Sequence, residues 1–246
     1  MDQLLIALDV DSATRALALV DTLRGVAGGF KIGSELFTAE GPSLVRETVR
    51  RGGRLFLDLK FHDIPNTVAG AIRSATRLGV WMTNVHASGG RDMMRAAADA
   101  AAEEAVRLAR ERPLVIAVTV LTSLDDAELS KLGITCGAAA QVQALAAAAQ
   151  EAGLDGVVAS PREVEAIRRT CGEAFVIVTP GIRSPQASGR DDQLRTASAR
   201  DAVAAGASYI VVGRPVTAAE DPRAAVANLV AEASPPRTLR EGAREC

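Results

Sequence analysis

Two carboxylates and one ammonium group lie within a short segment of the chain, Leu55–Val68, which reads LFLDLKFHDIPNTV. The apolar residues at its start have the composition of a buried strand. Asp58, Lys60 and Asp63 follow them, and Pro65 closes the segment. Because side chains at i and i+2 of a strand point to the same side, we expect Asp58 and Lys60 to lie next to each other where the strand runs out into a loop. The segment therefore predicts a charge pair at the mouth of a site.

The alternative for this pair is a solvated ion pair on a surface strand, which typically contributes about 0–1 kcal/mol to stability. Charged networks also serve structural roles. The rest of the chain favours a functional site, because other polar residues are predicted to meet Asp58 and Lys60 at one rim.

The chain has 246 residues, of which 48% are hydrophobic and 24% are charged. These values are ordinary for a soluble globular protein, and the length suits one α/β barrel. We expect a single barrel domain over residues 1–233. Residues 234–246 are polar, begin with Ser-Pro-Pro and show no period, so we expect a tail with little order.

Composition also argues against several classes of function. The net charge of −2 and the aromatic content of 3% give neither the basic footprint nor the stacking platform of nucleic-acid binders. No apolar run approaches the roughly 18 residues of a membrane span, and the N-terminus leads directly into a strand-like run. We therefore expect a cytoplasmic protein that binds neither nucleic acid nor membrane.

The cysteines and histidines form no recognisable metal site. Cys136, Cys171 and Cys246 are widely spaced and odd in number, which argues against a disulfide framework or a CxxC site and fits a reducing compartment. His62 and His86 are far apart in the sequence, and no HExxH motif accompanies them. The sequence predicts no bound metal.

Short β-rich apolar runs alternate with longer helical stretches, which is the pattern of βα units around a parallel sheet. The expected strands are Leu4–Leu8, Gly29–Ile32, Gly53–Leu57, Trp81–His86, Pro113–Val120, Gly156–Ala159, Phe175–Val178 and Ser208–Val212. The expected helices are Ser12–Arg24, Ser34–Arg51, Val68–Leu78, Asp92–Glu111, Ala138–Ala152, Pro161–Arg169, Ala199–Ala205 and Pro222–Glu232. Eight units suit a closed (β/α)8 barrel better than an open doubly wound sheet. The Gly-x-Gly-x-x-Gly motif of dinucleotide folds does not follow the first strand.

In a barrel, the carboxyl ends of the strands and the loops after them form the active site. Polar residues lie at or just beyond the ends of seven expected strands: Asp9, Lys31, Asp58 with Lys60, His86, Thr122, Thr179–Arg183 and Gly213–Pro215. The loops after the last two strands are where barrels often hold phosphate. The alternative for Gly213–Pro215 is a tight turn with an exposed arginine. Between these loops, Ser184–Arg190 is rich in Ser, Pro and Gly and could act as a mobile lid.

The run from Asp58 to Thr67, DLKFHDIPNT, closely resembles the signature of the orotidine 5′-phosphate decarboxylase family. Asp-x-Lys-x-x-Asp alone is shared with other barrel decarboxylases, whereas the Ile-Pro-Asn-Thr that follows is not. Further matches stand in the family's order and approximate spacing: Ala7–Asp9, Phe30–Gly33, Asn84–Ala87 with Gly89–Gly90, Leu121–Ser123, Thr179–Arg183 and Val212–Thr217. The chain is thus similar to this family over the barrel body, and the tail after Ser234 lies outside the resemblance.

The resemblance implies conversion of orotidine 5′-monophosphate to uridine 5′-monophosphate and carbon dioxide, without metal or cofactor. It also implies a homodimer whose two sites lie at the subunit interface. By this likeness, Asp63 reaches into the partner's site together with Ile64 and Thr67.

The same likeness assigns the remaining roles. Asp58 and Lys60 flank the reacting carbon, and Lys31 contacts the ribose and joins the charged network. The implied substrate contacts are Asp9 to the ribose, Thr122 to the pyrimidine or its loop, Arg183 with Gly213 and Arg214 to the phosphate, and Gln193 from the lid, with Gln186 as a rival for the last role.

The chemistry agrees with these roles. Loss of carbon dioxide from C6 of the pyrimidine leaves an electron pair in the ring plane, where the π system cannot delocalise it in the usual way. A preorganised ammonium in a site shielded from water can stabilise that charge. Lys60 is the candidate, and it would also deliver the proton that ends the reaction. Asp58 aims Lys60, and its charge faces the substrate carboxylate. Phosphate binding far from C6 can supply the energy for ordering the lid.

Two alternatives remain open from the sequence. One is a related phosphosugar decarboxylase that uses magnesium and an enediolate, although Lys31 and Lys60 would crowd the carboxylates that magnesium needs. The other is a non-catalytic barrel that binds a phosphate ligand. The second alternative predicts no turnover and nucleotide binding that is unaffected by Lys60→Ala.

Overall fold

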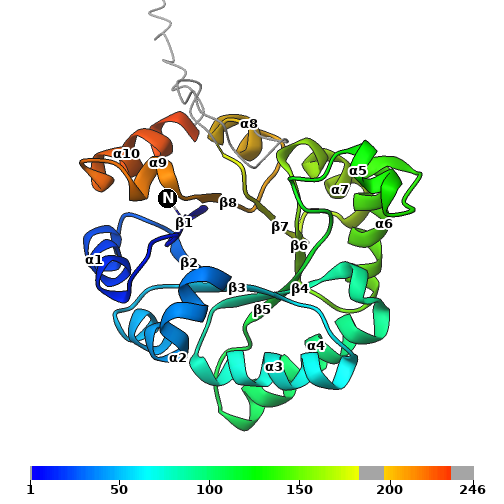
Figure 1. Cartoon of the computed structure of the whole chain (residues 1–246), viewed down its shortest axis with the longest axis horizontal. Coiled ribbons are helices and arrows are strands. Elements are labelled where there is room, and N and C mark those ends of the chain that lie inside the picture. Colours follow the sequence, from blue (N-terminus) through cyan, green and yellow to red (C-terminus); the bar gives the residue numbers. More distant parts are fainter. Residues whose placement is uncertain (1, 183–196, 234–246) are drawn as a thin grey trace, which may run out of the picture.

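Eight parallel strands close into a barrel in which each strand pairs with the next along the chain and β8 pairs with β1. The computed structural model describes residues 2–182 and 197–233. Figure 1 shows the strands at the centre of the molecule and the helices around them. The strands are β1 (Leu4–Ala7), β2 (Gly29–Gly33), β3 (Leu55–Phe61), β4 (Met82–His86), β5 (Leu114–Val118), β6 (Gly156–Val158), β7 (Val176–Thr179) and β8 (Tyr209–Val212). The prediction of a (β/α)8 barrel is confirmed.

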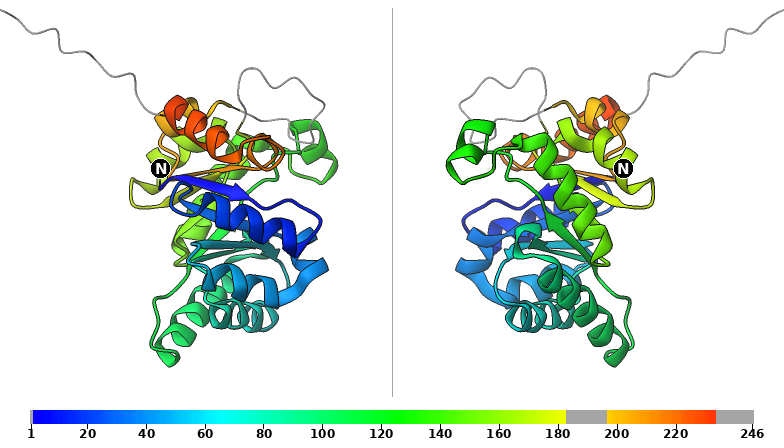
Figure 2. Two further views of the ribbon diagram at one scale, coloured as in Figure 1. Left: turned by 90° about the vertical axis from the view of Figure 1, so that its left-hand side faces the viewer. Right: turned by 90° about the vertical axis from the view of Figure 1, so that its right-hand side faces the viewer.

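The helices pack outside the strands, and the side views of Figure 2 show α3 and α4 on the side of the barrel opposite α8 and α10. The helices are α1 (Ala13–Leu23), α2 (Ser34–Arg50), α3 (Pro65–Leu78), α4 (Arg91–Arg107), α5 (Asp126–Lys131), α6 (Gly137–Glu151), α7 (Val164–Cys171), α8 (Ala199–Ala204), α9 (Arg214–Thr217) and α10 (Pro222–Ala233), with 3-10 turns η1 (Ala87–Gly89) and η2 (Pro161–Glu163). The sequence did not predict the short helices α5 and α9, which have six and four residues. Among the described residues, no helix is long and apolar enough to cross a membrane.

Pro65 begins α3, so the predicted start of this helix at Val68 is corrected by three residues. A proline suits the first turn of a helix, because its missing N–H would have no partner there. The helix ends at Gly79, whose φ of 80° is the left-handed conformation that glycine adopts readily. Asp63 therefore lies in a very short loop between β3 and α3, directly beyond the carboxyl end of β3.

Side chains of successive strand residues point alternately into the barrel and toward the helices. On β1, Leu4 and Ile6 pack in the cluster between strands and helices, whereas Leu5 and Ala7 pack in the barrel interior. The apolar interior consists of Leu5, Ala7, Phe56, Met82, Ile116, Val178 and Val211. Because this layer fills the barrel, a ligand has access only above it or below it.

Aromatic contacts fill the barrel at the amino ends of the strands. The Trp81 ring packs edge-on against the Tyr209 ring, with centroids 5.0 Å apart and planes at 82°. The Arg54 guanidinium lies 5.0 Å from the centroid of the Trp81 ring, within cation–π range. This end of the barrel is therefore occupied by side chains, which leaves the carboxyl ends of the strands for function.

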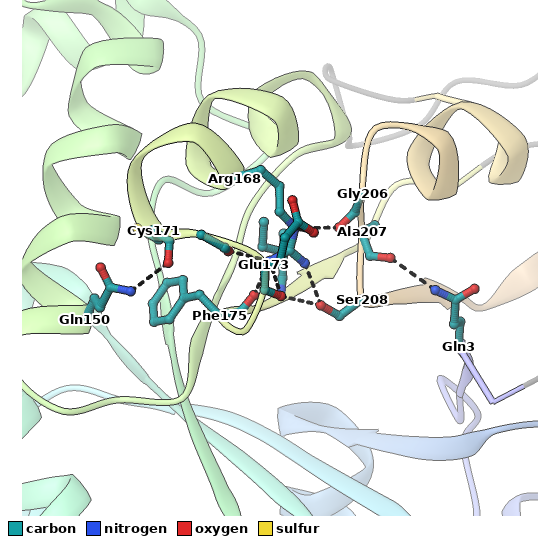
Figure 3. A network of polar contacts seen from close by, with 11 residues as sticks. Gln3, Gln150, Arg168, Cys171, Glu173, Phe175, Gly206, Ala207 and Ser208 are labelled. Carbon is teal, nitrogen blue, oxygen red and sulfur yellow. Dashed lines mark hydrogen bonds and ion pairs between the residues drawn. The ribbon is translucent and has the colours of Figure 1, made fainter.

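Arg168 of α7 holds together the loops that lead into β7 and β8 (Figure 3). Its guanidinium donates hydrogen bonds to the Phe175 carbonyl, to the Gly206 carbonyl at 2.9 Å and to the Ser208 hydroxyl oxygen at 2.8 Å. The same hydroxyl oxygen accepts a bond from the Ile177 N–H at 3.1 Å. Because the Arg168 side chain is only 10% exposed, these bonds form away from competing water and fix the amino ends of two adjacent strands.

Candidate active site

Interior-facing residues change from apolar to polar toward the carboxyl ends of β2, β3 and β4. On β3, Phe56 of the apolar interior is followed two positions later by Asp58, and on β4 Met82 is followed by Asn84. On β2, Lys31 lies between two residues that pack against the helices, so it also faces the interior. Strand alternation thus places polar side chains directly above the apolar layer.

Four charged residues, one just beyond β1 and the others on β2 and β3, form a row of alternating sign, which we call the charge network: Asp9, Lys31, Asp58 and Lys60. Lys31 Nζ lies 3.1 Å from Asp9 Oδ1 and 3.5 Å from Asp58 Oδ2. Lys60 Nζ lies 2.7 Å from Asp58 Oδ1. The predicted proximity of Asp58 and Lys60 is confirmed, and Lys31, which was expected to join the charged network, lies in the same row together with Asp9.

The two inner members of the charge network are buried and the two outer members reach solvent. The side chains of Lys31 and Asp58 are 11% and 12% exposed, whereas those of Lys60 and Asp9 are 34% and 53% exposed. A ligand entering at the carboxyl ends of the strands can therefore meet the ammonium group of Lys60 and the carboxylate of Asp9.

The pKa values of the two inner residues both favour the charged forms. Burial alone would lower the pKa of Lys31, but the charges of Asp58 and Asp9 outweigh burial and raise this pKa above its ordinary value. Burial alone would raise the pKa of Asp58, but the charges of Lys31 and Lys60 outweigh it and lower this pKa. Lys31 and Asp58 are therefore both ionised at neutral pH.

A bulge in β3 brings Asp58 and Lys60 together. Leu57 pairs with Thr83 of β4, but Phe61 pairs with Val85, so three residues of β3 stand opposite the single residue Asn84. At Lys60, φ is 53°, a left-handed conformation that is uncommon for residues other than glycine. The expected strand ended at Leu57 and ran into a loop, and this prediction is corrected, because β3 continues to Phe61.

Asn84 fills the space inside the bulge and was not predicted as a site residue. Its side-chain amide nitrogen donates to Asp58 Oδ1 at 2.7 Å, and its Oδ1 accepts the backbone N–H of Lys60 at 2.8 Å. Asn84 is fully buried. The signal that could have identified it is a polar residue in the interior-facing register of a barrel strand.

Two glycines leave room beside the charge network. A Cβ atom on Gly33 would lie 3.0 Å from Lys31 Nζ, and one on Gly213 would lie 3.4 Å from Asp9 Oδ2. The backbone of Gly33, with φ of −93° and ψ of −178°, suits any residue, so the space beside Lys31 is what favours glycine. The predicted phosphate loop, which continues from Gly213 into α9 at Arg214, therefore lies next to Asp9.

Other predicted site residues lie near the rim without a polar contact to the network. Asp63, Ile64 and Thr67 are exposed and Thr122 is half-buried. The Asp63 carboxylate accepts the Ile64 N–H at 2.6 Å. In the part of the chain that the structure describes, no hydrogen bond or ion pair joins these four residues to Asp58 or Lys60.

The remaining predictions fall on residues that the structure does not describe. They are Arg183, Gln193 with its rival Gln186, the predicted lid Ser184–Arg190, and the tail 234–246.

The two histidines lie beside each other near Lys60. The rings of His62 and His86 are 5.4 Å apart between centroids and tilted by 39°. Burial and the neighbouring charges of His62 and Lys60 lower the pKa of His86, so this side chain is neutral at pH 7. Within residues 2–182 and 197–233, no group of three or more His, Cys, Asp and Glu side chains could hold a metal ion.

Comparison with known proteins links this geometry to one family. A model described as "Orotidine 5′-phosphate decarboxylase / HUMPS family" matches residues 2–229. The orotidine 5′-phosphate decarboxylase of Moorella thermoacetica is 56% identical over 232 residues, which covers 94% of this chain and 92% of that protein. The enzyme of the same name from Alkalilimnicola ehrlichii is 55% identical over 230 residues, covering 94% and 95%.

A solved structure gives the same result in three dimensions. The crystal structure of orotidine 5′-phosphate decarboxylase from Lactobacillus acidophilus superposes with a TM-score of 0.82 at 36% sequence identity. The superposition covers 94% of this chain and 99% of that one. The span matched by the family model contains the whole charge network and Asn84.

Proposed function

The chain belongs to the orotidine 5′-phosphate decarboxylase family, and from this premise we propose that Lys60 acts at the carbon that loses carbon dioxide. The chain is an enzyme of pyrimidine biosynthesis that converts orotidine 5′-monophosphate to uridine 5′-monophosphate and carbon dioxide. The observation that carries the role of Lys60 is its ammonium group, partly open to the rim and held 2.7 Å from a buried carboxylate.

In the proposed reaction, the bond between C6 and the carboxylate carbon breaks and its electron pair stays on C6. The pair lies in the ring plane, so the ammonium group of Lys60 stabilises it electrostatically, which is most effective where the site excludes water. An N–H proton of Lys60 then moves to C6, which leaves an amine that recovers its proton from solvent. The products are carbon dioxide and the nucleotide with hydrogen at C6.

Asp58 has two roles in this proposal. Its hydrogen bond fixes the direction of the Lys60 ammonium group. Because Asp58 is ionised, its charge also faces the negative carboxylate of the substrate, and departure of that group relieves the repulsion. Lys31 lies between Asp9 and Asp58. Its ammonium group separates the two carboxylates, and its positive charge reduces the repulsion between them.

The remaining substrate contacts follow from the likeness to the family and from position. Asp9 and Lys31 hold the ribose, and Gly213, beside Asp9, begins the phosphate site that Arg214 completes. We assign Arg183 to the same phosphate, Thr122 to the pyrimidine and Gln193 to a contact from the lid. These contacts, far from C6, raise the fraction of substrate that is bound in the reactive position.

The proposed reaction uses neither metal nor cofactor. Magnesium binds carboxylate oxygens that are free to coordinate it, whereas the carboxylates of Asp9 and Asp58 both lie within ion-pair distance of the Lys31 ammonium group. This donor set suits an ammonium better than a divalent cation. We place the activity in the cytoplasm, together with the rest of pyrimidine biosynthesis.

The purified wild-type protein should convert orotidine 5′-monophosphate in the presence of EDTA, at the rate measured without EDTA. The reaction is followed by the loss of ultraviolet absorbance as the pyrimidine loses its carboxylate, and the product is identified by chromatography. Turnover that disappears with EDTA and returns with magnesium would support the metal-dependent alternative. Nucleotide binding without any turnover would support a non-catalytic barrel.

We also propose a homodimer in which Asp63, Ile64 and Thr67 reach the partner's site. Two observations support this proposal: Asp63 makes no ion pair within the described residues, and the side chain of Ile64 is 67% exposed, so both are accessible to a partner subunit. Each site would then combine Asp58 and Lys60 of one protomer with Asp63 of the other.

Mixing inactive Asp63→Ala and Lys60→Ala proteins should restore turnover. Random exchange of equal amounts gives about half heterodimers, each with one complete site, so about a quarter of wild-type activity is expected. Two tags on the two variants confirm that heterodimers have formed, and a mixture of two differently tagged Lys60→Ala preparations serves as the control. Verified heterodimers without activity would contradict the shared site.

A further inference from the structure

We infer that Asn84 is a positioning residue of this site, which holds the Lys60 ammonium group in place by fixing both ends of the Asp58–Lys60 bulge. This inference rests on the proposed role of Lys60. It assigns a function to a residue that touches neither solvent nor, in the proposed reaction, the substrate.

The pairing of β3 with β4 is irregular beside Asn84. In a regular parallel ladder, the pair Leu57 and Thr83 would be followed by Leu59 opposite Val85, but Phe61 takes that place. The bulge therefore removes the residues around Lys60 from the regular ladder. The Lys60 N–H is instead bound by the side-chain oxygen of Asn84 at 2.8 Å, so a side chain replaces the missing strand partner.

The backbone of Lys60 is in a left-handed conformation. Its φ of 53° is costly for a residue with a side chain, and such a conformation persists only where surrounding contacts determine it. A chain without the Asn84 oxygen would lose the contact that holds this peptide group. The direction in which the lysine side chain leaves the strand depends on that peptide group.

The carboxylate of Asp58 is also held by Asn84. The amide nitrogen of Asn84 and the ammonium group of Lys60 both donate to Asp58 Oδ1, at 2.7 Å each. The other oxygen, Oδ2, lies 3.5 Å from Lys31 Nζ. Asn84 thus sets the rotation of the Asp58 carboxylate, and the carboxylate in turn aims Lys60. The fully buried side chain of Asn84 therefore holds both the backbone N–H of Lys60 and the counter-ion of Lys60, which is Asp58.

An amide is the side chain that suits this position. It has a donor for Asp58 and an acceptor for the Lys60 N–H. An ionised carboxylate of the same shape could accept from Lys60 but would repel Asp58, whereas a protonated carboxyl group could make both bonds. Asn84→Asp should therefore regain function as the pH falls, which a purely steric role of Asn84 does not predict.

The test compares Asn84→Ala, Asn84→Asp and the matched control Thr83→Val. Thr83 is the adjacent residue of β4, is fully buried, and also bonds to β3, through its hydroxyl group to the Leu57 carbonyl at 3.1 Å, but it faces away from the charge network. We expect kcat of Asn84→Ala to fall about 100-fold with KM changed only a few-fold, as for a small displacement of a catalytic group. Thr83→Val should keep kcat within a few-fold of wild type.

For Asn84→Asp, the ratio of its kcat to that of wild type should rise at least tenfold as the pH is lowered from 8 to 5. The charged and titratable groups near the new carboxyl are Asp58 and Lys60 on β3, Lys31 on β2 behind Asp58, and the pair His62 and His86. Dividing by the wild-type rate at each pH removes the titration of these shared groups. Ile116, which pairs with Asn84 from β5, is apolar and adds no charge.

Hydrogen exchange gives a second readout that does not depend on activity. The amide of Lys60 should exchange faster in Asn84→Ala than in wild type, while the amide of Val85 on the next strand stays protected. If Asn84→Ala does not fold, the pH series of Asn84→Asp and its Lys60 exchange rate decide the question.

The inference and the proposed function fail in different ways. If Lys60→Ala is inactive while folded Asn84→Ala turns over within a few-fold of Thr83→Val, then Asn84 does not position Lys60 and only the inference is overturned. If the ratio of the Asn84→Asp kcat to the wild-type kcat does not change across the pH range, the inference is likewise overturned and the proposed function is not. If Lys60→Ala itself remains active, the proposed function fails first.

Discussion

Replacing Lys60 by alanine is expected to lower kcat by about 10⁴-fold or more. A positioned general acid contributes roughly 10²–10⁴-fold and a preorganised charge that stabilises the developing anion roughly 10²–10³-fold, and Lys60 supplies both. The measurement is kcat for orotidine 5′-monophosphate with enough protein to detect slow turnover. Binding of uridine 5′-monophosphate should change far less than kcat, because Lys60 acts at C6 and not at the phosphate.

The chain offers a matched control, because it contains only three lysines. Two of them, Lys31 and Lys60, belong to the charge network, and the third, Lys131, is 70% exposed on α5, where it pairs with Glu128. Lys131→Ala should leave kcat unchanged. Lys60→Gly separates activity from folding, because glycine adopts a φ of 53° without the steric penalty. This variant should be inactive yet folded, with a melting temperature above that of Lys60→Ala, because both lack the ammonium group and only glycine is free of the steric penalty. Turnover of Lys60→Ala within tenfold of wild type would refute the role of Lys60.

Replacing Asp58 by asparagine is expected to lower kcat by about 10²–10³-fold, the usual loss when one electrostatic contact in an active site is removed. Asparagine keeps the shape of the side chain, but it leaves the ammonium groups of Lys31 and Lys60 without the carboxylate that both contact. The repulsion between Asp58 and the substrate carboxylate is also lost. KM should therefore fall together with kcat, as for removal of ground-state strain. A KM that rises while kcat is unchanged would assign Asp58 to binding alone.

The Asp58→Asn variant should also change how the stability of the protein depends on pH. The pKa of Asp58 lies below its ordinary value of 3.8, so its charge stabilises the folded state above that pH and the contribution is lost as the pH falls through the folded-state pKa. The pKa of Lys31 lies above 10.5, so its contribution is complete below that pH and is lost only as the pH rises through the raised value. The difference in free energy of unfolding between wild type and Asp58→Asn should be constant near neutral pH and shrink below about pH 4.

The sequence predicted the barrel well because strand and helix periods are local signals. All eight strands were placed, and the predicted proximity of Asp58 and Lys60 is confirmed, although a bulge with a left-handed Lys60 produces it instead of regular strand alternation. Asp9 and Lys31 were grouped with Asp58 and Lys60 because all four were expected at the carboxyl ends of strands, and the structure places them in one row. These predictions need only the fold and the direction of each side chain.

The bulge and Asn84 could not be predicted in the same way. A register shift depends on how β3 pairs with β4, and nothing within either strand alone specifies it. The left-handed Lys60 runs against the preference of lysine, so local propensity points away from it, as is common at functional sites. The role of Asn84 follows only once both strands are in place.

The most direct test of the account is a crystal structure with a nucleotide that cannot lose its substituent at C6, or with the product. We predict that Lys60 Nζ lies about 3–3.5 Å from C6, the separation of a near-attack arrangement, with Asp58 still bonded to Lys60 and Asn84 still bonded to Asp58. A structure in which the ammonium group of Lys60 points into solvent, with the nucleotide bound away from the charge network, would contradict the account.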